Sequence, residues 1–169
     1  MSLAHARLER PSVFSKAQCE ELLNHVQAFE PGRWHRRLKI NSLPTTEVGR
    51  TDHFFAGTQA DYYFCGDANQ PPEFNALFRA MAPVIEGHFL TEAIINRYEI
   101  GQGMAEHVDR ALYRVNLVIP LVECGDGLFV EDVWYEDIAG AGVYFKSNSP
   151  RHYVPPVKSQ RFLAIYLYE

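Results

Sequence analysis

The sequence has little cysteine and no long apolar run, and both absences narrow the class of protein. Its three cysteines, Cys19, Cys65 and Cys124, include no two that are close enough for a CxxC pair. A disulfide framework or a thiolate zinc site is therefore not expected, and reduced thiols are typical of intracellular proteins. No stretch reaches the roughly 18 apolar residues that a membrane-spanning helix needs, and the segment from Met1 to Pro11 has no apolar signal region. We expect a cytoplasmic protein.

Basic residues are also too few to give the chain a positive charge. Lys and Arg number 16 against 21 Asp and Glu, which gives a formal net charge of -5. Proteins that bind nucleic acids gain much of their affinity by neutralising phosphates, so this balance argues mildly against a nucleic-acid partner. The chain has no internal repeat, low-complexity tract or linker either. Its 169 residues suit a single domain over 1–169.

A capping box predicts where the first helix begins. Ser15 and Gln18 precede a run of apolar residues at helical spacing that continues to Phe29, so each side chain can bond to the backbone N–H of the other residue. The pair Pro31-Gly32 ends this helix after about four turns.

A second apolar stripe, from Phe74 to Phe89, predicts a second helix. Pro83 lies inside this stripe, where we expect it to kink or restart the helix because proline lacks a backbone donor. Between the two helices we expect three short extended pieces, at 34–40, 52–55 and 61–64.

After Leu90 the helical period disappears and short β-type runs take over. Turn residues separate these runs, which are 94–100, 113–121, 128–130, 142–145, 152–154 and 162–168. Helices followed by many short strands favour a mainly β fold with flanking helices. We predict a double-stranded β-helix, a jelly-roll or cupin-like core, braced by two N-terminal helices.

The segment from Ile95 to Asp109, INRYEIGQGMAEHVD, is the most informative about chemistry. Residues i and i+2 of a strand point to the same side, so His107 and Asp109 can present ligand atoms to one point inside a barrel. A second histidine would complete a two-histidine, one-carboxylate metal site, which leaves positions open for a chelating co-substrate and dioxygen. His152 is the best candidate, because it follows a turn-like segment and opens a β-type run.

Arg161 stands nine residues after His152, at the head of the last predicted strand. A strand, a short turn and a strand fit between them, so both side chains can face one cavity. Arg161 shares its side of the strand with Leu163, Ile165 and Leu167, and an arginine on an apolar inward face needs a partner. A bidentate pair with the distal carboxylate of 2-oxoglutarate would meet that need.

Together these residues resemble a known family. The pattern Tyr-x-x-Gly, five residues, His-x-Asp, and then a distal His with a basic residue nine positions later resembles the Fe(II)/2-oxoglutarate dioxygenases. The prolyl-4-hydroxylase-like branch matches through Tyr98, Gly101 and Gln102 ahead of the His-x-Asp pair. The resemblance covers roughly 14–168 and is specific from Asn96 onward.

The resemblance implies an enzyme that uses Fe(II), 2-oxoglutarate and dioxygen. His107, Asp109 and His152 would hold the iron, and Arg161 would anchor the co-substrate. Such enzymes couple the decarboxylation of 2-oxoglutarate to succinate with the hydroxylation of a substrate C–H bond. We expect a hydroxylase that acts on an amino-acid side chain, free or in a peptide.

Two departures from the prolyl hydroxylases leave other functions open. Met104 stands where that branch usually has Tyr, and the Gly that usually precedes the basic anchor is missing. The residues Asn96 and Tyr98 resemble those that contact 2-oxoglutarate in AlkB-type demethylases of nucleic-acid bases. Here, however, Arg161 is present without the second C-terminal arginine of that branch. A barrel that binds a ligand without turnover is the third possibility.

Further polar residues could contact a substrate. Arg110, Tyr113, Arg114 and Asn116 follow the His-x-Asp pair and could line the mouth of the site, with Arg110 and Arg114 as candidate substrate contacts; an ordinary strand with one polar face is the alternative. Basic residues within 33–39 could bind an anionic substrate, although basic runs are more often solvated surfaces. The substrate and the oligomeric state cannot be predicted from these patterns.

Overall fold

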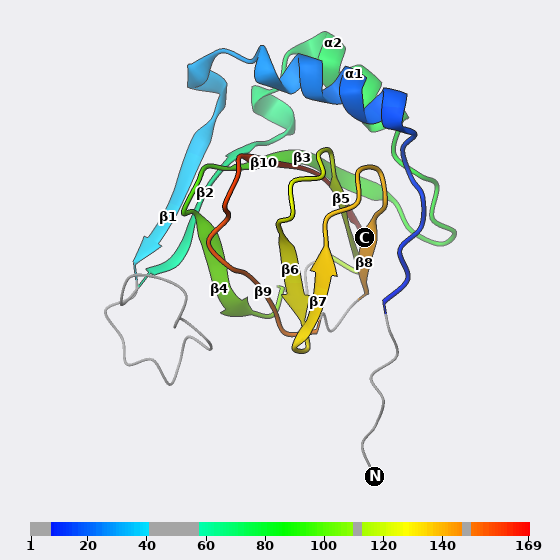
Figure 1. Ribbon diagram of the computed structural model, residues 1–169. Helices are drawn as coiled ribbons and strands as arrows, with labels where there is room; N and C mark the ends of the chain where they lie inside the picture. Colours follow the sequence, from blue (N-terminus) through cyan, green and yellow to red (C-terminus); the bar gives the residue numbers. More distant parts are fainter. Residues whose placement is uncertain (1–7, 41–57, 110–112, 147–149) are drawn as a thin grey trace.

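The computed structural model describes residues 8–40, 58–109, 113–146 and 150–169. It is mainly β, with helices α1 and α2 lying together on one side of a curled sheet (Figure 1). The helices are α1 (Lys16–Gln27) and α2 (Pro72–Ala80), with 3-10 turns at Pro31–Arg33 and Asp67–Asn69. The strands are β1 (His35–Ile40), β2 (Thr58–Cys65), β3 (Leu90–Tyr98), β4 (Gly103–His107), β5 (Val115–Pro120), β6 (Gly127–Val130), β7 (Val133–Glu136), β8 (Val143–Lys146), β9 (His152–Val154) and β10 (Arg161–Tyr168). The predicted jelly-roll class is confirmed.

The strands form one antiparallel sheet that curls on itself. Its order is β7-β6-β9-β4-β2-β3-β10-β5-β8, and β1 pairs with β2 outside this path. Pairing of β4 with β9 places His107 opposite His152, and pairing of β10 with β3 places Arg161 opposite Tyr98. The register of two strand pairs thus brings together residues that are far apart in the sequence.

The central strands are apolar on both faces, because each face covers a different core. Toward the helices, Ile95 of β3 packs in a cluster with Leu22 of α1 and Phe78 of α2. Toward the barrel interior, Tyr98 of β3 and Leu163 of β10 belong to a second cluster. Alternate residues of one strand therefore brace the helices and line the interior.

The first helix begins as predicted and the second ends earlier than predicted. Ser15 and Gln18 form both hydrogen bonds of the capping box, at 2.8 and 3.2 Å. The second helix stops at Ala80, and the prediction that it continues past Pro83 to Phe89 is wrong. Phe89 is 81% exposed and pairs its backbone with the C-terminal residue. Pro83 removes a backbone donor just beyond the last turn, so the helix does not resume.

The predicted extended runs correspond to strands with shifted ends, except for 52–55, which lies outside the described residues. Strand β4 was not among the predicted runs, and neither was strand β7. Strand β7 has mostly exposed residues, and its turn uses Glu131 and Asp132 at positive φ rather than the Gly or Asn that usually signals a hairpin. Among the described residues, neither helix is long and apolar enough to cross a membrane.

Candidate metal centre and cavity

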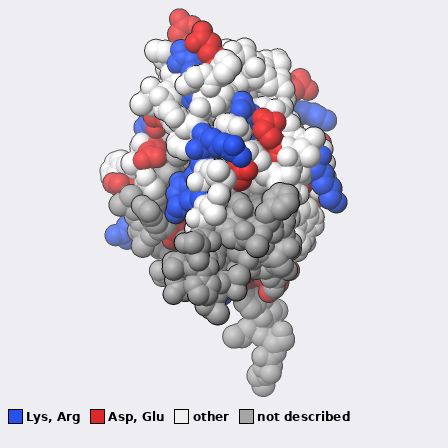
Figure 2. Space-filling view, turned by 90° about the vertical axis from the view of Figure 1, so that its left-hand side faces the viewer, with Lys and Arg blue, Asp and Glu red and all other residues white. Residues whose placement is uncertain are grey.

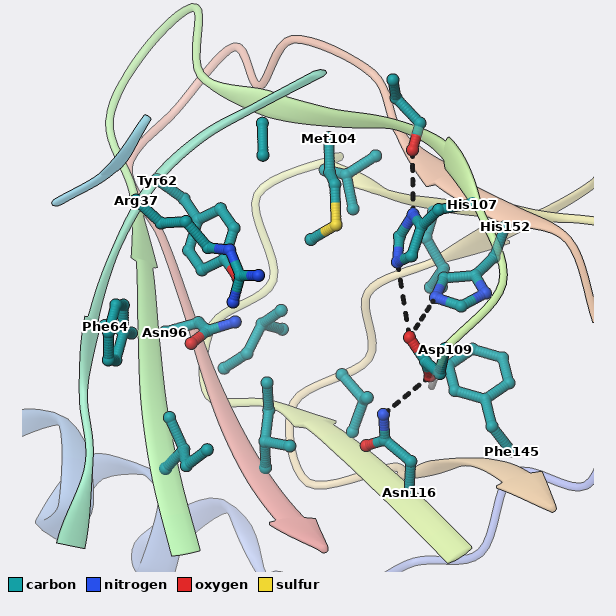
Figure 3. A pocket seen from close by; sticks show the side chains of 18 of the residues that line it. Arg37, Tyr62, Phe64, Asn96, Met104, His107, Asp109, Asn116, Phe145 and His152 are labelled. Carbon is teal, nitrogen blue, oxygen red and sulfur yellow. Dashed lines mark hydrogen bonds and ion pairs between the residues drawn. The ribbon is translucent and has the colours of Figure 1, made fainter. Parts of the chain in front are cut away.

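Three side chains converge at one point inside the barrel (Figure 3). One ligand atom from each of His107, Asp109 and His152 lies within 4.8 Å of the other two. Nε2 of each imidazole is 3.4 Å from Oδ1 of Asp109. Strand β4 ends at His107, strand β9 begins at His152, and Asp109 follows β4 by two residues. The structure thus brings together the three residues that the sequence picked out as metal ligands.

Backbone carbonyls orient both imidazoles. Nδ1 of His107 donates to the carbonyl of Ala105 and Nδ1 of His152 donates to the carbonyl of Pro150, each at 2.8 Å. A carbonyl can only accept, so each neutral ring carries its proton on Nδ1 and a lone pair on Nε2. Two nitrogen lone pairs and a carboxylate oxygen therefore point at one another. Such an arrangement is stable only with a cation or a proton between the three atoms.

The second oxygen of the Asp109 carboxylate is also hydrogen-bonded. Nδ2 of Asn116, on β5, donates to Oδ2 of Asp109 at 2.9 Å. Burial disfavours the ionised carboxyl, but when the facing Nε2 atoms carry a proton, the charge and hydrogen bonds of the two imidazoles outweigh burial and hold the pKa of Asp109 well below its usual range. Asn116 thus fixes the orientation of an ionised ligand, a role that the sequence did not assign to it.

The donor set fits an iron ion. Two imidazoles and one carboxylate on one side of a metal, with room on the other side, are typical of non-haem Fe(II) sites. The room is a cavity of about 890 Å³ in front of the three ligands, within the range of small-molecule sites. Its apolar wall includes Phe64, Ile94, Met104, Val118, Leu163, Ile165 and Leu167. Its polar wall includes Arg37, Tyr62, Asn96, Tyr98 and Arg161.

Arg161 lines this cavity, as expected, but it already has a partner that the sequence did not reveal. Its Nε and Nη2 atoms donate to the two oxygens of Asp137 at 2.6 and 2.8 Å. The side chains of Arg161 and Asp137 are 0% and 1% exposed. Burial disfavours the charged guanidinium, but Asp137 outweighs burial, and the pKa of Arg161 is raised. Arg161 is therefore a permanent cation.

One edge of this guanidinium remains open. Nη1 of Arg161 is buried and has no hydrogen-bond partner among the described residues. Asp137 occupies the Nε–Nη2 edge, which leaves the Nη1–Nη2 edge for a second carboxylate. A buried donor without a partner is costly, so this edge indicates an anionic ligand.

The other predicted site residues are only partly in place. Asn96 and Tyr98 line the cavity on the same face of β3. Arg110 lies outside the described residues. Arg114 is exposed and is not among the residues that line the cavity, so its role as a substrate contact stays a prediction. Tyr113 does line the cavity, and its hydroxyl donates to Glu92 at 2.7 Å.

Comparison with known proteins gives structural matches only. No family model and no curated sequence matches the chain. A solved 2OG-Fe(II) oxygenase-family oxidoreductase from Burkholderia pseudomallei has a TM-score of 0.60 at 16% identity, over 93% of this chain and 81% of that one. A Pseudomonas putida prolyl-4-hydroxylase has a TM-score of 0.59 at 19% identity, over 99% and 94% of the two chains. The chain has the fold of these oxygenases.

The same fold also serves other reactions. The carbocyclase SnoK from nogalamycin biosynthesis, described as α-ketoglutarate dependent, has a TM-score of 0.60 at 15% identity, over 94% of this chain and 77% of that one. Likeness in fold at such low identity does not determine a substrate. The function of this chain has to come from the residues of its own cavity.

Proposed function

We propose that this chain is an Fe(II)- and 2-oxoglutarate-dependent dioxygenase that hydroxylates an amino-acid side chain. One observation carries the proposal: three metal-ligand atoms converge in the same cavity that holds a buried guanidinium with one open edge. A site that binds a metal alone has no need of this second feature. Bound iron would supply the oxidation of 2-oxoglutarate and substrate by dioxygen, and the chain supplies binding, orientation and exclusion of water.

The three metal ligands, Arg161 and two polar residues of β3 would each have a specific role. His107, Asp109 and His152 would hold the iron, and the open edge of Arg161 would bind the distal carboxylate of 2-oxoglutarate. Burial raises the pKa of Tyr98, so its phenol stays protonated and can donate a hydrogen bond to the co-substrate. Asn96 lies two residues from Tyr98 on the same face of β3, and its side-chain amide can also donate a hydrogen bond to the co-substrate.

An amino-acid side chain suits the remaining space. Much of the cavity wall is apolar, which suits an aliphatic substrate carbon, and a prolyl-4-hydroxylase is among the similar structures. The test is to add Fe(II) and 2-oxoglutarate without oxygen, record the metal-to-ligand charge-transfer absorption, and then admit oxygen and measure succinate. We expect the absorption and succinate release from the natural chain and neither from the His107→Ala variant.

The role of Arg161 needs a variant that still folds. Arg161→Met alone would leave the buried carboxylate of Asp137 without a counter-charge, so the change is combined with Asp137→Asn. The double variant should bind 2-oxoglutarate about 100-fold more weakly, since losing a buried charge pair to a ligand costs 2–5 kcal/mol.

Absence of both the charge-transfer absorption and succinate release from the natural chain would overturn the proposal. Consumption of a methylated single-stranded oligonucleotide would replace it with base demethylation, and 2-oxoglutarate binding without turnover of any substrate would favour a binding barrel.

A further inference from the structure

Strand β1 divides its basic side chains between the two faces of the sheet. Arg37 lies opposite Tyr62 of β2, and both side chains line the cavity. Its neighbour Arg36 points to the other face, where it forms a bidentate ion pair with Asp61 at 2.9 and 3.0 Å. Of the arginines and the lysine within 33–39, only Arg37 and Lys39 therefore line the cavity; Arg36 belongs to a surface ion pair and Arg33 donates to the carbonyl of Asn69.

Arg37 has no acidic partner among the described residues, whereas the acidic residues of the cavity wall are engaged elsewhere. Glu92 accepts a hydrogen bond from Tyr113 at 2.7 Å, and Glu106 faces Arg151 at 3.5 Å. The group beside Arg37 is the phenol of Tyr62: burial raises the pKa of Tyr62 and the guanidinium offsets part of that rise. Within the described part of the chain, Arg37 thus presents to the cavity a positive charge that forms no ion pair.

Arg37 also lies across the cavity from the metal ligands. Figure 3 shows Arg37, Tyr62 and Asn96 on one side and the three ligands on the other. The apolar residues Ile94 and Ile165 line the same cavity. Arg37 is exposed, unlike the fully buried Arg161. Figure 2, which views the molecule from the side of β1, shows basic side chains reaching the surface there next to carboxylates.

We propose that Arg37 binds the carboxylate of the substrate, so that the substrate is a small acid with an apolar body. For an amino-acid hydroxylase this means a free amino acid or the C-terminal residue of a peptide, because an internal residue has no carboxylate on its main chain. Lys39, two residues along the same face of β1, also lines the cavity and adds to the positive potential. The proposal rests on the proposed function for the chemistry, but anion binding at Arg37 can be measured without turnover.

The test compares an acid with its neutral analogue. The full chain is loaded with Zn(II) and 2-oxoglutarate, so that Arg161 is occupied, and is titrated calorimetrically with 3-phenylpropanoate, 3-phenylpropanamide and 3-phenylpropyl phosphate. The acid should bind about 10-fold more tightly than the amide, as expected for one charge-assisted pair in a partly open site. Arg37→Gln should abolish this preference, and Arg37→Lys should retain part of it.

Arg36→Gln is the matched control, because it removes the adjacent arginine from the opposite face and should leave the preference unchanged. Equal binding of acid and amide, no acid binding at millimolar concentration, or a preference that survives Arg37→Gln would each overturn the inference. Tighter binding of the phosphate than of the acid would overturn the choice of a carboxylate substrate. Weaker 2-oxoglutarate binding in Arg37→Gln would make Arg37 the co-substrate anchor instead. If the preference for the acid over the amide depends on Arg37 but the chain releases no succinate, only the proposed function would be overturned.

Discussion

Replacing Asp137 by Asn should destabilise the protein strongly, although Asp137 does not touch the metal ligands. Its carboxylate pairs with Arg161 across 24 residues of sequence, and both side chains are essentially inaccessible to water. Removing one partner of such a pair leaves the other charge uncompensated, which typically costs 3–5 kcal/mol. Because the asparagine oxygen can still accept one bond, we expect a loss of about 3 kcal/mol in the free energy of unfolding. That corresponds to a melting temperature lower by about 6–12 °C for a chain of this length.

Thermal unfolding by circular dichroism, with urea titration at 25 °C, measures this loss. Arg36→Gln, which breaks the exposed pair with Asp61, should lower stability by less than about 1 kcal/mol. The double variant Asp137→Asn with Arg161→Met should recover much of the loss, because neither charge is then left alone. Saturating 2-oxoglutarate should raise the melting temperature of Asp137→Asn more than that of the natural chain, since its carboxylate replaces the missing counter-charge. A melting temperature for Asp137→Asn equal to that of the natural chain would refute the reasoning.

Three further changes test other parts of the structure. Asn116→Ala should weaken metal binding about 10-fold by releasing Asp109, as measured by competition with a chelating dye, and unchanged affinity would contradict a positioning role. Gly140→Ala should lower the free energy of unfolding by about 2 kcal/mol or more in urea titration, because φ is 81° and a Cβ would collide with the Phe14 carbonyl. Ser15→Ala should cost about 1 kcal/mol by loss of the helix cap, and a variant as stable as the natural chain would show that the cap contributes nothing.

The metal site could be predicted from the sequence because its signals are local. His107 and Asp109 are two residues apart in the sequence. The nine positions from His152 to Arg161 are enough for one strand and one turn. In the last strand Arg161 shares its side with Leu163, Ile165 and Leu167, and all four residues line the cavity. The antiparallel pairing of β4 with β9 then brings the two histidines together, in a register that the barrel closure sets.

The electrostatic partners of the site could not be predicted, because they come from elements without a periodic signal. Asp137 follows β7, a strand with mostly exposed residues, and no spacing rule connects it to Arg161. Arg37 stands in a run of basic residues whose faces are set only by the pairing of β1 with β2. Asn116 was noted only as a residue near the mouth, since its contact with Asp109 depends on how β5 approaches the end of β4. Each of these contacts depends on the packing of strands, which a single sequence leaves open.

The charges of the cavity suggest how a substrate acid would be oriented in the proposed complex. A divalent ion with Asp109 contributes one net positive charge, and Arg161 is already balanced by Asp137. A bound 2-oxoglutarate dianion would therefore leave the inner end of the cavity with a net negative charge. An incoming carboxylate is repelled from that end and attracted to Arg37 on the opposite side, which directs the apolar part of the substrate toward the metal. Because Asp137 already balances Arg161, bound co-substrate thus favours one orientation of a substrate acid that enters after it.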